Sequence, residues 1–282
     1  MELWFTEKHT KGTGIILKCK RTIYSTKSPF QQIDVLETED FGRMLLLDGL
    51  VMTTERDEFI YHEMLVHPPM HYHGNARNVL VIGGGDGGAV RELLKYPSIE
   101  HVTLCEIDKE VVETAKKFFP SLSSRLDDQR VELIFQDGST LLKESNRCFD
   151  LIVIDSTDPI GAAKALFTKE FYSTCQRALA DGGLLCAQSE SPIYHTAIIK
   201  QMKTDMENAG FGFVCAYTAP IPTYPGGYWS WMMAGAGHFQ LDNLVTGLLP
   251  ENEYHKLNYF NCEILKAAFS LPNFLKKAIS SP

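Results

Sequence analysis

The chain has 282 residues, a formal net charge of −8 at pH 7, and 44% hydrophobic and 22% charged residues. This composition is typical of a globular protein with one large domain or two smaller ones. The acidic balance argues against a nucleic-acid surface, which needs clustered positive charge. No apolar run approaches the roughly 18 residues of a membrane span, and no signal peptide is visible. The 7 cysteines are scattered without C-x-x-C spacing, as in a reducing compartment. We therefore expect a cytoplasmic protein that binds neither nucleic acid nor membranes.

Residues 1–55 are expected to form a small antiparallel β domain. Short β-prone segments are separated there by turn-forming residues, a pattern typical of a meander. These segments are 15–19, 32–37 and 44–47. Asp48-Gly49 lies between two leucines and predicts a two-residue hairpin turn.

Residues 56–282 are expected to form a second, larger domain. A helical pattern begins at Arg56, and Pro68-Pro69 is predicted to end that helix. Apolar runs then alternate with helical segments such as 109–119 and 167–180. This order is typical of a Rossmann-like, doubly wound α/β fold with a mostly parallel sheet. The predicted strands are 79–82, 101–105, 131–135, 150–154, 183–188, 211–217 and 230–234, and two further helices are predicted at 262–269 and 274–279.

The stretch from Val79 to Arg91 carries the strongest functional signal. Its apolar run predicts a buried parallel strand, and the glycine-rich turn Gly83–Gly88 follows directly before a helical pattern. Glycines let a ligand approach the backbone, and a helix start offers free N–H groups. The next predicted strand ends in Glu106, where a carboxylate can bind ribose hydroxyls. The combination predicts a nucleoside site, with tight helix–strand packing as the alternative.

Carboxylates follow four of the predicted strands. Asp86, Glu106, Asp137, Asp155 and Asp158 all lie just after a strand, at the sheet edge where ligands bind in such folds. Any one of them could instead cap the helix that follows. So many acids would repel phosphate, which disfavours NAD and favours a cationic S-adenosyl compound. Its ribose would lie on Glu106, its adenine amine near Asp137 and its sulfonium near Asp86, while Asp155 and Asp158 suit a second cationic ligand.

Several motifs in these positions resemble those of the spermidine synthases, a family of polyamine aminopropyltransferases. They are Tyr61-His62-Glu63-Met64, the Gly83–Gly88 turn, Glu106-Ile107-Asp108, Asp137-Gly138, the segment Asp155–Gly161 and the segment Ile221–Pro225. Phe41-Gly42-Arg43 and Leu271-Pro272 add to the likeness, which therefore covers nearly the whole chain.

The resemblance implies transfer of an aminopropyl group from the co-substrate decarboxylated S-adenosylmethionine to putrescine, giving spermidine and 5′-methylthioadenosine, without a cofactor or a metal. It implies that Asp155 is the catalytic base. The residues it assigns to the donor are Gln31, Gly83, Gly85, Asp86, Glu106, Ile107, Asp137 and Gly138. The residues it assigns to the amines are Tyr61, His62, Asp86, Asp155, Asp158 and Tyr224. It also implies a homodimer or homotetramer built through the N-terminal β domain.

Three alternatives to this function stay open. The acceptor could be cadaverine or spermidine, because the sequence does not reveal the length of the amine channel. A putrescine N-methyltransferase would use full S-adenosylmethionine, whose carboxylate Asp86 would repel. A regulator that only binds the nucleoside would not need both Asp155 and Asp158.

One departure from the family pattern and one alternative for the aromatic residues also stay open. Ala162 stands where the family usually has proline, which predicts a more mobile open lid because a fixed φ is lost. Tyr61 and Tyr224 could be ordinary core aromatics.

Overall fold

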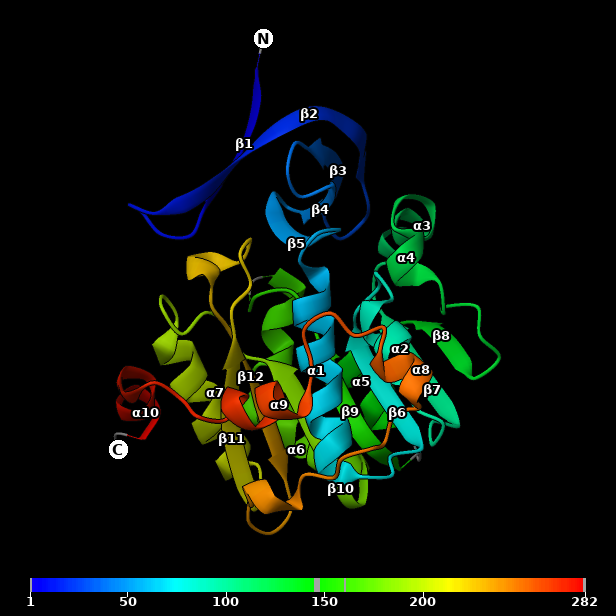
Figure 1. Cartoon of the computed structure of the whole chain (residues 1–282), viewed down its shortest axis with the longest axis vertical. Helices are drawn as coiled ribbons and strands as arrows, with labels where there is room; N and C mark the ends of the chain where they lie inside the picture. Colours follow the sequence, from blue (N-terminus) through cyan, green and yellow to red (C-terminus); the bar gives the residue numbers. More distant parts are fainter. Residues whose placement is uncertain (1, 145–147, 160, 281–282) are drawn as a thin grey trace.

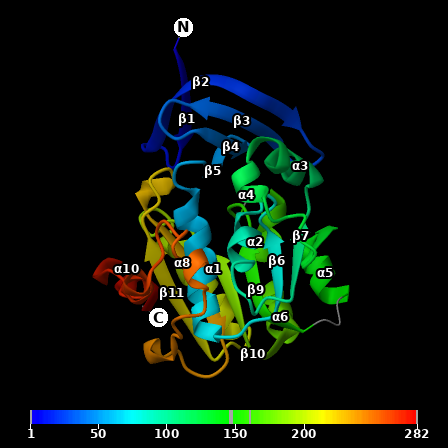
Figure 2. The ribbon, with the colours of Figure 1, turned by 45° about the vertical axis from the view of Figure 1, so that its right-hand side comes forward.

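The computed structural model describes residues 2–144, 148–159 and 161–280. A small sheet at the N-terminal end lies above a larger sheet that has helices on both faces (Figures 1 and 2). Ile160 of the family motif falls outside the described residues. The expected effect of Ala162 on a lid therefore stays a prediction.

The small sheet is five-stranded in the order β1-β2-β3-β4-β5, and all neighbouring strands are antiparallel. Its strands are β1 (Leu3–Lys8), β2 (Gly14–Lys27), β3 (Gln32–Thr38), β4 (Arg43–Leu47) and β5 (Leu50–Thr54). Asp48 and Gly49 have φ angles of 50° and 81°, the left-handed conformation that a two-residue hairpin needs. The hairpin turn is therefore confirmed. β1 and most of β2 were not predicted, because polarity does not follow burial there: Leu3 and Trp4 are exposed, whereas Glu7 is buried, and most of β2 is exposed or only partly buried.

The larger sheet is seven-stranded in the order β11-β12-β10-β9-β6-β7-β8. Its strands are β6 (Asn78–Gly83), β7 (His101–Glu106), β8 (Val131–Phe135), β9 (Phe149–Asp155), β10 (Leu179–Gln188), β11 (Phe213–Ala219) and β12 (Trp229–Gly235). In the described part of this sheet, β12 pairs antiparallel with both β10 and β11, and the other neighbouring strands pair in parallel. The Rossmann-like, mostly parallel α/β fold is confirmed.

Helices cover both faces of the large sheet. The α-helices are α1 (Glu58–His73), α2 (Gly88–Leu93), α3 (Lys109–Phe118), α4 (Pro120–Ser123), α5 (Gly138–Glu144), α6 (Lys169–Ala178), α7 (Thr196–Asn208), α8 (Glu251–Tyr254), α9 (Cys262–Ala268) and α10 (Asn273–Ser280). Val79 and Val81 of β6 belong to a buried cluster that includes residues of α1, α2 and α9, whereas Leu80 and Ile82 belong to a second cluster with residues of α5, α6, α7 and α10. Both faces of β6 are buried, which explains its unbroken apolar run. None of the described helices has the length and apolar character needed to cross a membrane.

Helix α1 corrects one prediction. Pro68-Pro69 was expected to end it, but it continues to His73 and stops at Gly74, whose φ is 83°. The two prolines cannot donate to the carbonyls of Met64 and Leu65, the usual partners one turn earlier.

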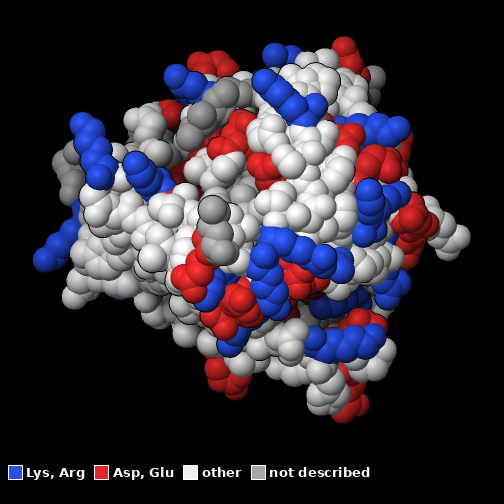
Figure 3. Space-filling model, turned by 90° about the horizontal axis from the view of Figure 1, so that it is seen from above, with Lys and Arg blue, Asp and Glu red and all other residues white. Residues whose placement is uncertain are grey.

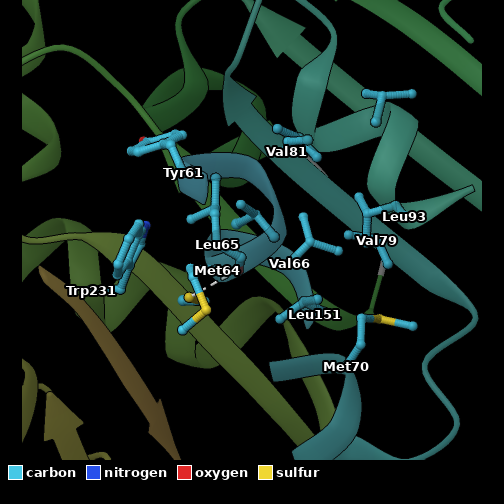
Figure 4. Close-up of a cluster of buried hydrophobic side chains, with 14 of the residues drawn as sticks. Tyr61, Met64, Leu65, Val66, Met70, Val79, Val81, Leu93, Leu151 and Trp231 are labelled. Atoms are coloured by element: carbon cyan, nitrogen blue, oxygen red, sulfur yellow. Dashed lines mark hydrogen bonds between the residues drawn. The ribbon is translucent and has the colours of Figure 1, made fainter. Parts of the chain in front are cut away.

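The freed carbonyls find other donors on the sheet beneath α1. The hydroxyl of Tyr217 on β11 donates to the Met64 carbonyl at 2.9 Å, and the thiol of Cys186 on β10 lies 3.5 Å from the Leu65 carbonyl. Apolar contacts surround this part of α1, with Met64, Leu65 and Val66 packed among β6, β9 and β12 (Figure 4). The prolines are therefore tolerated because tertiary partners replace the lost helical hydrogen bonds.

We predict that Tyr217→Phe lowers the free energy of unfolding by about 1–3 kcal/mol, because it leaves the buried Met64 carbonyl without a donor. Tyr172→Phe is the matched control, since Tyr172 is equally buried and its hydroxyl has no hydrogen-bond partner among the described residues. Urea denaturation of both variants measures the difference. Equal losses would contradict the role given to the Tyr217 hydroxyl.

Candidate active site

A pocket of ≈ 260 Å³ lies at the carboxyl ends of the parallel strands and is lined by both sheets. Every residue that the sequence assigned to a site lines it: Gln31, Tyr61, His62, Gly83, Gly85, Asp86, Glu106, Ile107, Asp137, Gly138, Asp155, Asp158 and Tyr224. The small sheet and the turns beside its strands add Phe30, Leu45, Leu47, Leu50 and Met52. The sequence did not single out these apolar residues, because they look like the core of a β meander.

The glycine-rich turn holds β6 against the end of β9. Gly83 and Gly84 have φ angles of 79° and 68°, and a Cβ on Gly83 would lie 2.2 Å from the carbonyl oxygen of Asp155. The N–H of Gly84 donates to that same carbonyl at 2.8 Å. A side chain at Gly83 would push Asp155 out of place, so the glycines serve both packing and the shape of the pocket.

Glu106 and Gln31 meet at one end of the pocket through a residue that the sequence did not assign. Asp108 accepts from the Nε2 of Gln31 at 3.0 Å and from the hydroxyl of Ser28 at 2.6 Å, so it ties the small sheet to the end of β7. Glu106 accepts from the N–H groups of Gly85 and Asp108 at 3.2 and 2.9 Å. Burial and the nearby charge of Asp108 raise the pKa of Glu106 to about 7.

The helix-cap alternative holds for Asp137, since one of its oxygens accepts from the N–H of Thr140 at 2.8 Å at the start of α5. Asp86 precedes Gly87, the N-cap residue of α2, and does not cap that helix, although one of its oxygens accepts from the N–H of Gly88 at 2.8 Å. Both residues also line the pocket. These hydrogen bonds are therefore compatible with a place in the pocket, and each of them fixes a carboxylate.

Asp155 faces the middle of the pocket. One of its oxygens accepts from the Tyr61 hydroxyl at 2.7 Å, while the other is buried and has no hydrogen-bond partner among the described residues. Burial and the charge of Asp86 raise the pKa of Asp155 to about 6, against the opposing effects of His62 and the Tyr61 hydrogen bond. Burial also raises the pKa of Tyr61 well above its usual value, so this residue stays a neutral donor.

His62, Asp86 and Asp155 form a compact group in which one candidate ligand atom of each lies within 4.8 Å of the others. The sequence had offered no metal-ligand spacing for His62. Both ring nitrogens of His62 face carboxylates, Glu58 at 2.7 Å and Asp86 at 3.4 Å. Burial opposes the charged ring, but these two carboxylates prevail and raise the pKa of His62 well above its usual value. An imidazolium has no lone pair for a metal, so the donor set suits an ion pair better than a metal.

Asp158 lies next to carboxylates that the sequence did not identify. Burial, the charge and hydrogen bond of Glu190, and the charge of Glu7 raise the pKa of Asp158 to about 7. Glu190 is buried, has a left-handed φ of 75°, and lies 2.8 Å from His195. Its only signal in the sequence was its place two residues after the strand end at Gln188.

Tyr224 joins the pocket to the small sheet. Its hydroxyl donates to the carbonyl of Met52 on β5 at 2.6 Å, and its ring lies 5.6 Å from the ring of Tyr61. Asp57 holds the preceding loop by accepting from the N–H and hydroxyl of Thr223 at 3.0 and 2.8 Å. The core alternative for Tyr61 and Tyr224 is therefore only partly correct, since both are enclosed but also line the pocket.

The arrangement suits cationic ligands. Carboxylates from three parallel strand ends and the glycine-rich turn converge on one enclosed space, which favours ammonium and sulfonium groups over phosphate. Seen from above the small sheet, basic and acidic side chains are interspersed on the surface (Figure 3).

Comparison with known proteins relates both parts of the chain to one family. Residues 58–243 match the model described as "Spermine/spermidine synthase domain", and residues 3–55 match the "Spermidine synthase tetramerisation domain". Polyamine aminopropyltransferases from Bacillus mycoides and Methanocaldococcus jannaschii are 45% and 42% identical to the chain; each alignment covers 98% of this chain, and 98% and 95% of the relatives.

Solved structures agree with this relationship. A spermidine synthase in complex with the transition-state analogue AdoDATO superimposes with a TM-score of 0.91 at 40% identity, covering 98% of this chain and 94% of that one. The spermidine synthase from Thermotoga maritima gives a TM-score of 0.89 at 40% identity, with the same coverage. The chain therefore belongs to the spermine/spermidine synthase family and is a polyamine aminopropyltransferase.

Proposed function

We propose that this enzyme transfers the aminopropyl group of decarboxylated S-adenosylmethionine to putrescine, giving spermidine and 5′-methylthioadenosine. The observation that carries the proposal is the buried, unpartnered oxygen of Asp155, which faces a pocket lined by further carboxylates. A buried acceptor without a donor is unfavourable, and an amine of the substrate would supply that donor.

The donor would lie along the pocket from Glu106 to Asp86. Glu106 accepts the ribose hydroxyls in this pose, while Gln31, Ile107, Asp137 and Gly138 surround the nucleoside. The glycine-rich turn leaves room for the sulfonium, and Asp86 binds the terminal amine of the aminopropyl group. A donor with a carboxylate at that position would be repelled by Asp86.

Asp155 would accept a proton from the attacking amine. The nitrogen lone pair then forms a bond to the methylene next to the sulfonium, the carbon–sulfur bond breaks, and its electron pair stays on the sulfur of methylthioadenosine. At ordinary pKa values near 10 and 4, the proton transfer costs about 8 kcal/mol. A pKa of about 6 for Asp155 reduces that cost to about 5 kcal/mol. Because the sulfonium is a good leaving group, orientation of the two substrates supplies much of the remaining catalysis, and the reaction requires no cofactor or metal.

The far amine of the acceptor would lie against Asp158. Glu190 and Glu7 increase the negative charge around that carboxylate, which suits an ammonium group. Tyr61 and Tyr224 would enclose the methylene chain between the two amines, and His62 borders the end near Asp86. Cadaverine or spermidine as the acceptor, and methyl transfer from full S-adenosylmethionine, are the competing activities.

A donor-by-acceptor assay tests the proposal. The purified protein is given decarboxylated or full S-adenosylmethionine with putrescine, cadaverine or spermidine, and products are identified by mass spectrometry. We expect methylthioadenosine and spermidine from the decarboxylated donor and putrescine. S-adenosylhomocysteine from the full donor would overturn the proposal and the role given to Asp86.

We predict that Asp155→Asn lowers kcat by at least about 100-fold, because the amide cannot accept the amine's proton. Asp150→Asn is a matched control at the opposite end of β9, where Asp150 accepts the N–H groups of Arg77 and Asn78. Single-turnover rates with both substrates saturating measure the effect. A kcat within a few-fold of the unmodified enzyme would rule out Asp155 as the base.

The rate should depend on pH through two carboxylates. Asp155, with a pKa of about 6, accepts a proton only above that pH, so kcat should fall as the pH drops through 6. Asp158, with a pKa of about 7, is neutral below that pH, so the KM for putrescine should rise below 7. Because deprotonation of the amine also favours reaction at high pH, we expect an alkaline optimum. Initial rates between pH 5.5 and 9 check this, and a flat profile with chemistry rate-limiting would contradict it.

We further propose that the enzyme is a homo-oligomer assembled through its small sheet. Exposed apolar residues on β1 and β2 support this, since Trp4 and Ile16 are 49% and 63% exposed.

We predict that the double variant Trp4→Glu, Ile16→Lys dissociates the oligomer, because charges would then be buried at the interface. Light scattering measures the mass, with Phe274→Glu on α10 as the control for an exposed apolar residue elsewhere. A unit of unchanged mass would place the interface on another surface.

A further inference from the structure

A line of buried and half-buried charged side chains runs from the pocket along the contact between α1 and α2. Its members alternate in charge: Asp86, His62, Glu58, Arg91, Glu92 and Lys95. Asp86 and His62 line the pocket, whereas the other four do not. Glu92 lies 2.8 Å from the Nε of Arg91 and 2.5 Å from the Nζ of Lys95.

The central part of this line is held by paired hydrogen bonds. Arg91 donates through Nη1 and Nη2 to the two oxygens of Glu58 at 2.8 and 2.9 Å, and Glu58 in turn lies 2.7 Å from the Nδ1 of His62. The Glu58 side chain is 8% exposed and that of Arg91 is 16% exposed. A two-pronged guanidinium–carboxylate pair of this kind fixes both position and orientation.

The ring of His62 is held by packing as well. It is 2% exposed, and a Cβ on Gly88 would lie 2.4 Å from the ring, so the start of α2 closes against it. The Nε2 of the ring lies 3.4 Å from Asp86, and a ligand atom of Asp155 lies within 4.8 Å of both. The ring therefore has one orientation, with its outer nitrogen directed at the carboxylates of the pocket.

We propose that Glu58 and Arg91 are positioning residues for the aminopropyl transfer: Arg91 fixes Glu58, Glu58 holds His62 as an imidazolium, and that charge lets Asp86 and Asp155 lie together as carboxylates. Two enclosed carboxylates without a cation would share a proton. A proton shared in this way would disable Asp155 as a base and Asp86 as the partner of the donor's amine. This inference rests on the proposed function.

The electrostatics of the cluster support the geometry. Burial opposes charge on Glu58, but the hydrogen bond from His62 and the two contacts with Arg91 lower its pKa. Burial also opposes charge on Asp86, but His62 lowers its pKa. The groups facing His62 are Glu58 from its own helix, Asp86 from the glycine-rich turn and Asp155 from β9. Asp155 is in turn faced by Asp86, His62 and Tyr61, and Tyr224 and Cys186 lie further away.

The test is the pH profile of Glu58→Gln, which keeps the shape of the side chain and removes its charge. We expect the acid limb of kcat/KM to move up by about one pH unit, so that the ratio of variant to unmodified rate falls roughly fivefold between pH 8 and pH 6. Arg91→Lys keeps the charge but loses the two-pronged contact, and should shift the limb in the same direction by less.

Lys95→Met is the matched control, because Lys95 belongs to the same line and contacts Glu92 but not Glu58. If Glu58 and Arg91 were merely structural, their variants would lose activity equally at every pH, as the control would. Parallel profiles for Glu58→Gln and the unmodified enzyme would overturn the proposal.

The ionisation of His62 can be measured without any turnover. Nitrogen-15 NMR of ring-labelled histidine should show His62 as an imidazolium at pH 7.5 in the unmodified enzyme, assigned by its loss in His62→Gln, and as a largely neutral ring in Glu58→Gln. A neutral His62 in the unmodified enzyme would overturn the proposal even if the aminopropyl transfer is confirmed. An imidazolium in a protein without that activity would instead count against the proposed function alone.

Discussion

The repulsion between carboxylates that share one enclosed pocket is the constraint on which the site depends. Asp86, Asp155 and Asp158 lie at the same sheet edge, and burial alone would favour their neutral forms. The protein provides one internal cation beside Asp86, the ring of His62. The charge of His195 acts on Asp158 in the same sense, but burial and the charges of Glu190 and Glu7 prevail, and the pKa of Asp158 is raised. In the proposed reaction, the remaining positive charge arrives with the substrates, so binding and the ionisation of the site are linked.

The small sheet forms part of the candidate active site, in addition to its proposed role in assembly. Gln31 reaches Asp108 across the gap between the sheets, and Tyr224 reaches back to the carbonyl of Met52. One contact lies at the proposed nucleoside end and the other at the proposed amine end. A shift of one sheet relative to the other would therefore disturb both substrates together. The same sheet carries the exposed apolar residues of β1 and β2, so the proposed assembly would use a sheet that also lines the pocket.

The sequence was most informative where physical signals are local. The buried run Val79–Ile82 has both faces covered, so its composition alone indicates a parallel strand, and the carboxylates that follow such strands share one edge by topology. Sequence patterns failed where contacts between distant segments determine the structure. Pro68 predicts a helix end, but α1 continues because the hydroxyl of Tyr217 on β11 donates to the Met64 carbonyl. Glu190 lies on a left-handed turn without glycine, and Glu7 lies on a strand far from the pocket in sequence. Nothing in a local pattern could bring them to Asp158.

The two prolines in α1 affect how precisely this helix is positioned along its own axis. A regular helix could slide along its axis, because each turn resembles the next. Here two specific carbonyls, those of Met64 and Leu65, are tied to side chains of β11 and β10. A slip of one residue would turn the helix by about 100° and carry it forward by about 1.5 Å, which would take Tyr61 away from Asp155. The two carbonyls freed by the prolines thus fix α1 at a single position along its axis, and this position also fixes Tyr61 and His62, which line the pocket one turn earlier.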